Sequence, residues 1–372
     1  MLNGPERCFN ARKNWLLGWY DDKSLTVDAN FNGKLVAFVD YELASTDRGE
    51  YVLLRVGDVY IQYNRAKGFN SGTQEHKNEV VFIREENTRE AEIASLVINA
   101  LGESQAFSRN GVTFEVCSFG FERGCDYADV RIYPTGTPST CATPPTTARS
   151  NSPTPLPSPV QPTFPSMESG RSRNSMKVLV VRVIGDSGAE QPTDRDRLAG
   201  AVFGIGAEPL SNSMSAQYNR CSFGQLDFIS ADGNPLISNG VLDLLLPFSL
   251  EGRNIYSTRH LFREETARVL GVSSSSLETM FDHVMFCVAS GTVPGWSAFV
   301  GNSHDSYFNS ARGRCDKLSA LMFASGRELG LHFSGDSNGP SGDSTGMVRI
   351  SIHFAFPMHA LTSFLVLCFL LM

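Results

Sequence analysis

The chain has 372 residues, of which 41% are hydrophobic and 19% are charged. This length allows two domains of ordinary size, each with an apolar core. The net charge of −7 and the shortness of the basic runs argue against a nucleic-acid-binding protein, so we expect no nucleic-acid partner.

The N-terminal region predicts a short helix. Residues 1–7 do not combine a charged segment with an apolar one, so no signal peptide is visible. Residues 8–20 then predict a helix in which Asn10 is the N-cap and Trp15 and Trp19 share a face.

Residues 25–133 predict a mostly antiparallel β module, a sandwich or barrel-like, led by this helix. Its expected strands are β-branched or aromatic runs at 35–39, 51–56, 59–63, 80–83, 113–117 and 128–133. Val56-Gly-Asp-Val59 predicts a tight hairpin, because Gly-Asp can supply positive φ angles. The segment 91–99 is compatible with either a short helix or a strand. We therefore assign 1–133 as one β-rich domain.

Residues 134–177 predict a linker. Ten of the 18 prolines fall within 134–165, mixed with serine and threonine. Such a segment cannot bury enough apolar surface to offset its conformational entropy, and it favours extended polyproline conformations. A plain spacer is the simplest interpretation, and an O-glycosylated stalk is the alternative if the chain is exported.

Residues 178–348 predict a second domain in which strands and helices alternate. The expected strands are 177–184, 225–230, 241–246, 283–288 and 296–300, and the expected helices are 194–203, 213–219 and 260–270. Thr193 is the expected N-cap of the first helix, and Gly271 ends the last. The alternation indicates an α/β layer sandwich, so the fold class of the whole chain is α+β or α/β.

The tail 349–372 is hydrophobic, but Pro357 interrupts it. The fifteen residues after this proline would span about 22 Å as a helix, less than the ~30 Å of a bilayer core. Three interpretations stay open: a membrane attachment, a cleaved lipid-anchor signal, or a tail created by a shifted reading frame.

The eight cysteines contain no C-x-x-C pair, which argues against a zinc ribbon or a thioredoxin motif. Cys117 and Cys125 bracket a short loop and are a candidate disulfide pair. The other cysteines fit either scattered disulfides of a secreted protein or buried thiols.

Residues 317–334 carry the motif on which a functional interpretation depends. Leu318, Leu321, Met322, Ser325 and Leu329 recur at helical spacing and form an apolar stripe. Gly330 follows where a left-handed glycine would end the helix. Phe323, Ala324 and Arg327 lie on the opposite face.

These residues resemble the zinc-binding helix of the gametolysin family, secreted zinc peptidases of algae that degrade cell walls. The resemblance lies in Leu-Gly-Leu-His-Phe-Ser-Gly at 329–335, in 213–226 and in Gly-Asp-Ser-Thr-Gly-Met at 342–347. Residues 8–20 resemble a segment that follows the catalytic helix in that family. The resemblance implies a metzincin-like mixed-sheet catalytic-type domain at 178–348 and a C-terminal part of such a unit at 1–133. It also implies an extracellular or membrane-attached location, with cell-wall or matrix glycoproteins as partners.

The zinc motif itself departs from the family pattern H-E-x-x-H-x-x-G-x-x-H. With Gly330 as its glycine, the metal-ligand positions hold Phe323, Arg327 and Phe333, and the general-base position holds Ala324. Phenylalanine has no lone pair, and arginine offers only donors. Glu328 lies about 100° round the helix from the second ligand position, and the nearby His332 lies one residue before the third. We therefore expect no catalytic residue and no bound zinc, although the family uses zinc as its cofactor.

Two orders of assembly and three functions stay open at this stage. The chain is either cut from a tandem array or is a permuted single unit whose halves dock; the linker is long enough for docking. The first functional hypothesis is a catalytically inactive homologue that binds matrix, wall components or a partner peptidase. The alternatives are an active zinc endopeptidase whose motif carries a sequence error, and a membrane-attached structural or adhesion module.

Overall fold

The computed structural model describes residues 8–73, 76–87, 93–139, 141, 175–185, 193–205, 212–250, 252–289, 298–300, 304–309, 315–331 and 334–335. Three mixed sheets and a small set of helices place the described chain in the α+β class. The predicted tail 349–372 lies outside these residues. Within the described part, no helix combines the length and apolar character needed to cross a membrane.

Two sheets in the first half form a β sandwich. Sheet A contains β1 (Ser24–Thr26), β4 (Leu53–Val56), β5 (Val59–Asn64), β6 (Glu79–Asn87), β7 (Ile93–Leu101) and β18 (Ser334–Gly335), in that order. Sheet B contains β3 (Glu50–Tyr51), β2 (Phe31–Val36), β10 (Cys125–Pro134), β9 (Val112–Glu122) and β8 (Gln105–Arg109). Alternating residues such as Ile61, Phe82, Val116 and Val130 fill one core between them.

The hairpin expected at Val56-Gly-Asp-Val59 is confirmed. Val56 pairs with Val59, and Gly57 has a φ of 57°. Of the ambiguous segment 91–99, residues 93–99 belong to strand β7, which pairs with β6; residues 91 and 92 lie outside the described residues. The short strand β8, which the sequence did not predict, completes sheet B at its edge.

The second half forms sheet C, in which β11 is the central parallel strand. The sheet contains β13 (Ile237–Ser238), β14 (Val241–Leu245), β11 (Ser175–Ile184), β15 (His283–Val288), β17 (Asp305–Asn309) and β16 (Ala298–Val300), with β12 (Asp227–Ser230) also paired to β11. β11 begins inside the predicted linker, most of which lies outside the described residues. β17 was not predicted, because its sequence Asp-Ser-Tyr-Phe-Asn has few apolar residues.

Helices cover both faces of sheet C. Helices α4 (Ile255–Leu270) and α5 (Leu277–Met280) share one apolar core with it, and α2 (Arg195–Phe203), α3 (Met214–Cys221) and α6 (Leu318–Glu328) share the other. Asp194, and not Thr193, is the N-cap of α2, because its carboxylate accepts hydrogen bonds from two backbone amides. The expectation of an α/β layer arrangement is confirmed for this half.

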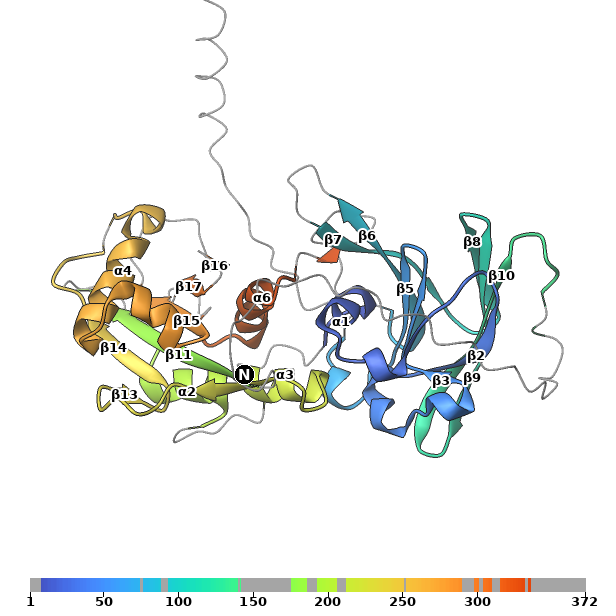
Figure 1. Ribbon diagram of the computed structural model, residues 1–372, viewed down its shortest axis with the longest axis horizontal. Helices are drawn as coiled ribbons and strands as arrows, with labels where there is room; N and C mark the ends of the chain where they lie inside the picture. Colours follow the sequence, from blue (N-terminus) through green and yellow to red (C-terminus); the bar gives the residue numbers. More distant parts are fainter. Residues whose placement is uncertain are drawn as a thin grey trace, which may run out of the picture.

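Helix α1 (Ala11–Leu17) joins the two halves. Asn10 caps it as predicted, its side chain accepting from the amide of Lys13. One face of α1 packs on sheet A, where Trp15 contacts Tyr60 with ring centroids 5.7 Å apart. In Figure 1, α1 and α6 both lie in the middle of a stack that runs from sheet C to sheet B.

The two halves share one buried core and one disulfide. Phe9 and Trp19 of the first half pack around Tyr218 of α3, with ring centroids 5.6 and 6.3 Å apart. Cys8 is disulfide-bonded to Cys221, 213 residues away. The hydroxyl of Tyr20 donates to the carbonyl of Cys221 at 2.8 Å. These contacts favour a single unit whose halves dock over two separate fragments.

The candidate pairing of Cys117 with Cys125 is wrong. The structure joins Cys117 to Cys141 and Cys287 to Cys315, and Cys125 is a buried free thiol. Cys125 pairs across the hairpin with Glu122, and Cys117 lies five residues further along β9. That separation is about 16 Å, whereas a disulfide needs Cα atoms within about 7 Å.

Cutting the linker should therefore leave the protein assembled. With a protease site introduced at 150–160, the cut protein should run as one band on a non-reducing denaturing gel and as two bands after reduction. Under native conditions the halves should co-elute in gel filtration even with reductant, because the apolar core still joins them.

The matched control is the double variant Cys8→Ser/Cys221→Ser. After the cut it should give two bands on the non-reducing gel and still co-elute natively. Separation of the cut halves under native conditions would contradict the shared core.

Candidate functional site

Helix α6 is anchored at both ends. The disulfide Cys287–Cys315 ties the residues before the helix to sheet C, and Asp316 accepts a hydrogen bond from Arg197 at 2.6 Å. At the other end Gly330 has a φ of 78°, as the sequence predicted for a C-terminal glycine. The amide of Leu331 then donates to the carbonyl of Gly326 at 2.9 Å, which closes the last turn.

The predicted apolar stripe of α6 is confirmed as a packing surface. Leu318, Leu321, Met322 and Ser325 are buried, and Leu329 is half-buried. The hydroxyl of Tyr218 donates to the carbonyl of Met322 at 3.1 Å, and Ser325 Oγ lies 2.7 Å from the carbonyl of Leu321. This stripe therefore holds α6 against α3 and sheet C.

The opposite face of α6 is buried as well. Phe323 is 4% exposed and Ala324 is 0% exposed, and both belong to the core that includes Phe9 of the first half. Phe9 also lies against Gly326, where an added β-carbon would come within 3.5 Å of its ring. Both positions at which the resemblance expected chemistry are thus covered by apolar side chains. Arg327 is half-buried.

These residues do not fit a zinc ion. A ligand must donate a lone pair, which the benzyl group of Phe323 lacks, and a guanidinium such as that of Arg327 offers only N–H donors. The methyl group of Ala324 cannot act as a base. Phe333, at the third ligand position, and the nearby His332 lie outside the described residues.

Two hollows in the described part of the chain lie away from these positions. A cavity of about 10 Å³ lies beside Cys8 and Phe9, with room for about one water molecule. A groove of about 300 Å³ lies at the far end of sheet B. Neither is lined by Phe323, Ala324 or Arg327.

Glu328 is the one chemically unusual group of α6. Both of its carboxylate oxygens are buried without a hydrogen-bond partner in the described chain. Burial, with a smaller contribution from the nearby charge of Asp305, raises the pKa of Glu328 to about 9. Its side chain is therefore neutral at physiological pH. The sequence had excluded Glu328 from the general-base position, but its burial could not be read from the helical pattern.

The histidines of the described chain do not converge on a metal site. His283 is fully buried, with Nε2 2.9 Å from Ser306 Oγ, and burial lowers its pKa to about 3. It is therefore a neutral residue of the core. His76 lies in the first half, 3.1 Å from Glu79.

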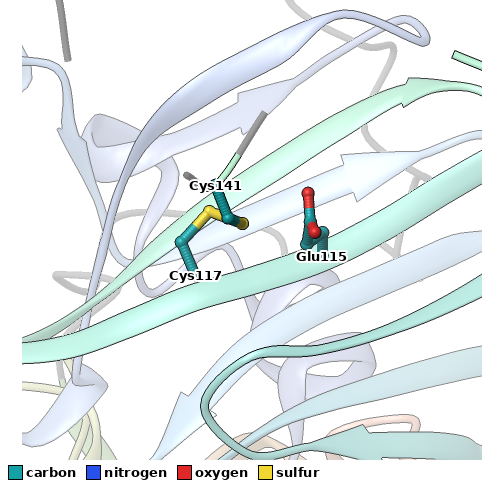
Figure 2. Close-up of side chains that lie close together, drawn as sticks. All are labelled: Glu115, Cys117 and Cys141. Carbon is teal, nitrogen blue, oxygen red and sulfur yellow. A yellow bond between two sulfur atoms is a disulfide. The ribbon is translucent and has the colours of Figure 1, made fainter. Parts of the chain in front are cut away.

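One cluster in the described chain has metal-type side chains at close range: Glu115, Cys117 and Cys141. Figure 2 shows that the two sulfur atoms are bonded to each other, with the carboxylate beside them. A disulfide offers no thiolate, and Glu115 already accepts hydrogen bonds from Tyr133 and Ser139. The cluster is therefore a structural cross-link of sheet B.

Comparison with known proteins adds no assignment: no family model, no curated protein and no solved structure matches this chain.

Replacing Phe323 tests whether this position is structural. Phe323→Ala should lower the free energy of unfolding by about 3–5 kcal/mol, because it removes a buried ring and leaves a cavity. Urea unfolding measures the loss. The control Leu245→Ala, at a residue that is 69% exposed, should change stability by less than about 0.5 kcal/mol. A loss below about 1 kcal/mol at Phe323 would contradict the packing role.

Replacing Glu328 tests its burial. The folded chain keeps Glu328 protonated up to about pH 9, whereas the unfolded chain ionises it near its ordinary value of 4.5. Folding therefore takes up a proton between these values, and the stability of the native protein falls as pH rises through that window. Glu328→Gln should raise stability near pH 8 by at least about 1 kcal/mol and have little effect near pH 4.

Thermal unfolding across this pH range measures the Glu328→Gln effect. The control is Glu265→Gln on α4, because Glu265 is hydrogen-bonded to Arg268 and its pKa is lowered. That substitution should give no stabilisation near pH 8. Equal behaviour of the two variants would show that Glu328 is solvated.

Proposed function

We propose that this chain is a catalytically inactive protein of gametolysin-like, metzincin-like architecture, which acts by binding at a cell wall or extracellular matrix. The observation that carries the proposal is the burial of α6 on both faces. Phe323 and Ala324, which occupy a ligand position and the base position, lie in an apolar core closed by the first half of the chain.

Two arguments support the proposal independently: the chemistry of these side chains, and the lack of space for a peptide substrate beside them. The side chains at these positions supply neither lone pairs for a metal nor a base for water. A peptide substrate also needs an open cleft beside the reacting groups, whereas Phe9 and Tyr218 pack beside this part of α6. Restoring one ligand would not restore the approach of a substrate.

The disulfides support an extracellular setting. Disulfides persist in oxidising compartments and are rare in the cytosol. Three occur in the described chain, and one of them, Cys8–Cys221, closes a separation of 213 residues. The proposed partners are matrix or wall glycoproteins.

Metal analysis combined with a protease assay tests the loss of activity. After dialysis against zinc and then buffer, the purified chain should retain far less than one zinc ion per molecule. It should show no chelator-sensitive cleavage of casein or of wall proteins. The variant Arg327→His should behave in the same way, because Phe323 and Ala324 still lack the required groups. Stoichiometric zinc with chelator-sensitive cleavage would overturn the proposal.

A further inference from the structure

A polar groove of about 300 Å³ lies where β2 and β10 pair at the outer end of the sandwich. It is lined by Asn30, Phe31, Asn32, Arg131, Ile132, Tyr133 and Thr137. The backbone pairs Asn32 with Arg131 and Phe31 with Ile132 across the two strands. Figure 1 shows that these strands belong to the end of the stack remote from α6.

One wall of the groove is the segment after β10, and it is fastened to the sheet. The amide of Thr137 donates to the carbonyl of Pro134 at 3.1 Å in a turn. The hydroxyl of Ser139 donates to Glu115, and Cys141 is bonded to Cys117 (Figure 2). The exposed Thr137 is thus held in place by a turn, a hydrogen bond and a disulfide.

Tyr133, which lines the groove, is held in place by a hydrogen bond to the sheet. The hydroxyl of Tyr133 donates to Glu115 at 3.1 Å, and Glu115 is 7% exposed. Burial and this hydrogen bond raise the pKa of Tyr133, so the hydroxyl stays protonated and keeps its lone pairs available. Tyr133 is therefore oriented before any ligand arrives, which reduces the ordering cost of binding.

The lining suits a ligand rich in hydroxyl groups. Asn30, Asn32 and Thr137 are exposed, and their side chains make no hydrogen bond to the described chain. Each amide offers two donors and an acceptor, and the threonine hydroxyl offers both functions. Arg131 is the one charged side chain of the lining, and it already has an interaction within the protein. A neutral ligand is therefore favoured over an anionic one.

We infer that this groove binds a sugar residue of a neutral polysaccharide. Adjacent sugar hydroxyls would pair with the amides of Asn30 and Asn32 and with Thr137. The apolar face of the ring would lie on the half-buried ring of Tyr133, which the alternation of β10 places on the same face of sheet B as Asn32. The volume is at the lower end of small-molecule sites, which fits one sugar unit of a chain that continues into solvent. The inference deepens the proposed binding role and rests on it for its setting.

Affinity electrophoresis tests the inference with the full chain. Native gels are cast with soluble arabinogalactan, xylan or β-1,3-glucan, and the mobility is compared with that in a gel without polysaccharide. At least one polysaccharide should retard the protein. Asn32→Ala and Thr137→Ala should each weaken the retardation about 3- to 10-fold, the effect of losing one hydrogen bond.

Two further variants separate the groove from the rest of the surface. Asn219→Ala removes an exposed amide from α3 in the other half and should bind as the native chain does. Cys117→Ser/Cys141→Ser should weaken retardation, because the wall that carries Thr137 is released. Retardation by none of the polysaccharides, or equal retardation of Asn32→Ala, Thr137→Ala and Asn219→Ala, would overturn the inference. Neither outcome depends on zinc or proteolysis, so failure here is distinguishable from failure of the proposed inactivity.

Discussion

The burial of α6 between the two halves of the chain is the contact on which the rest of the structure depends. The helix lies in one apolar core with residues of sheet C, α3 and the first half, and Phe9 and Tyr218 both lie against it at Gly326. A helix whose residues are mostly apolar is stable in water only when those residues are covered. The first half is therefore needed to complete the core of the second, and the disulfide Cys8–Cys221 links them covalently at that place.

This burial also explains the apolar residue types at Phe323 and Ala324. A charged or metal-binding group at Phe323 would have to be desolvated inside the core, whereas a phenyl ring gains free energy there. Glu328, the last residue of the same helix, illustrates this desolvation cost. Its carboxyl group lacks a hydrogen-bond partner in the described chain and remains protonated. Packing thus accounts for the apolar residues of α6.

The sequence predicted most elements but few of their partners. Local patterns were sufficient for the hairpin at Val56–Val59, the cap at Asn10 and the glycine end of α6, because neighbouring residues determine these features. The pairing of Cys117 with Cys141 depends on how β9 and β10 align and on where the chain returns after β10, which no spacing rule contains. The burial of Glu328 and the groove beside Asn32 likewise arise from segments distant in the chain.

The order of the two halves along the chain imposes no particular physical requirement once they share a core. The packing energy depends on which surfaces meet and not on which is synthesised first. A longer linker between the halves adds little loop-closure entropy, about 0.6 kcal/mol for each doubling of its length. The cross-link between Cys8 and Cys221 further restricts the unfolded chain, which favours the docked state. Docking in turn buries α6 and leaves the outer end of sheet B exposed at Asn30, Asn32 and Thr137. A chain built in this way has an exposed polar groove at one end while α6 lies in its core.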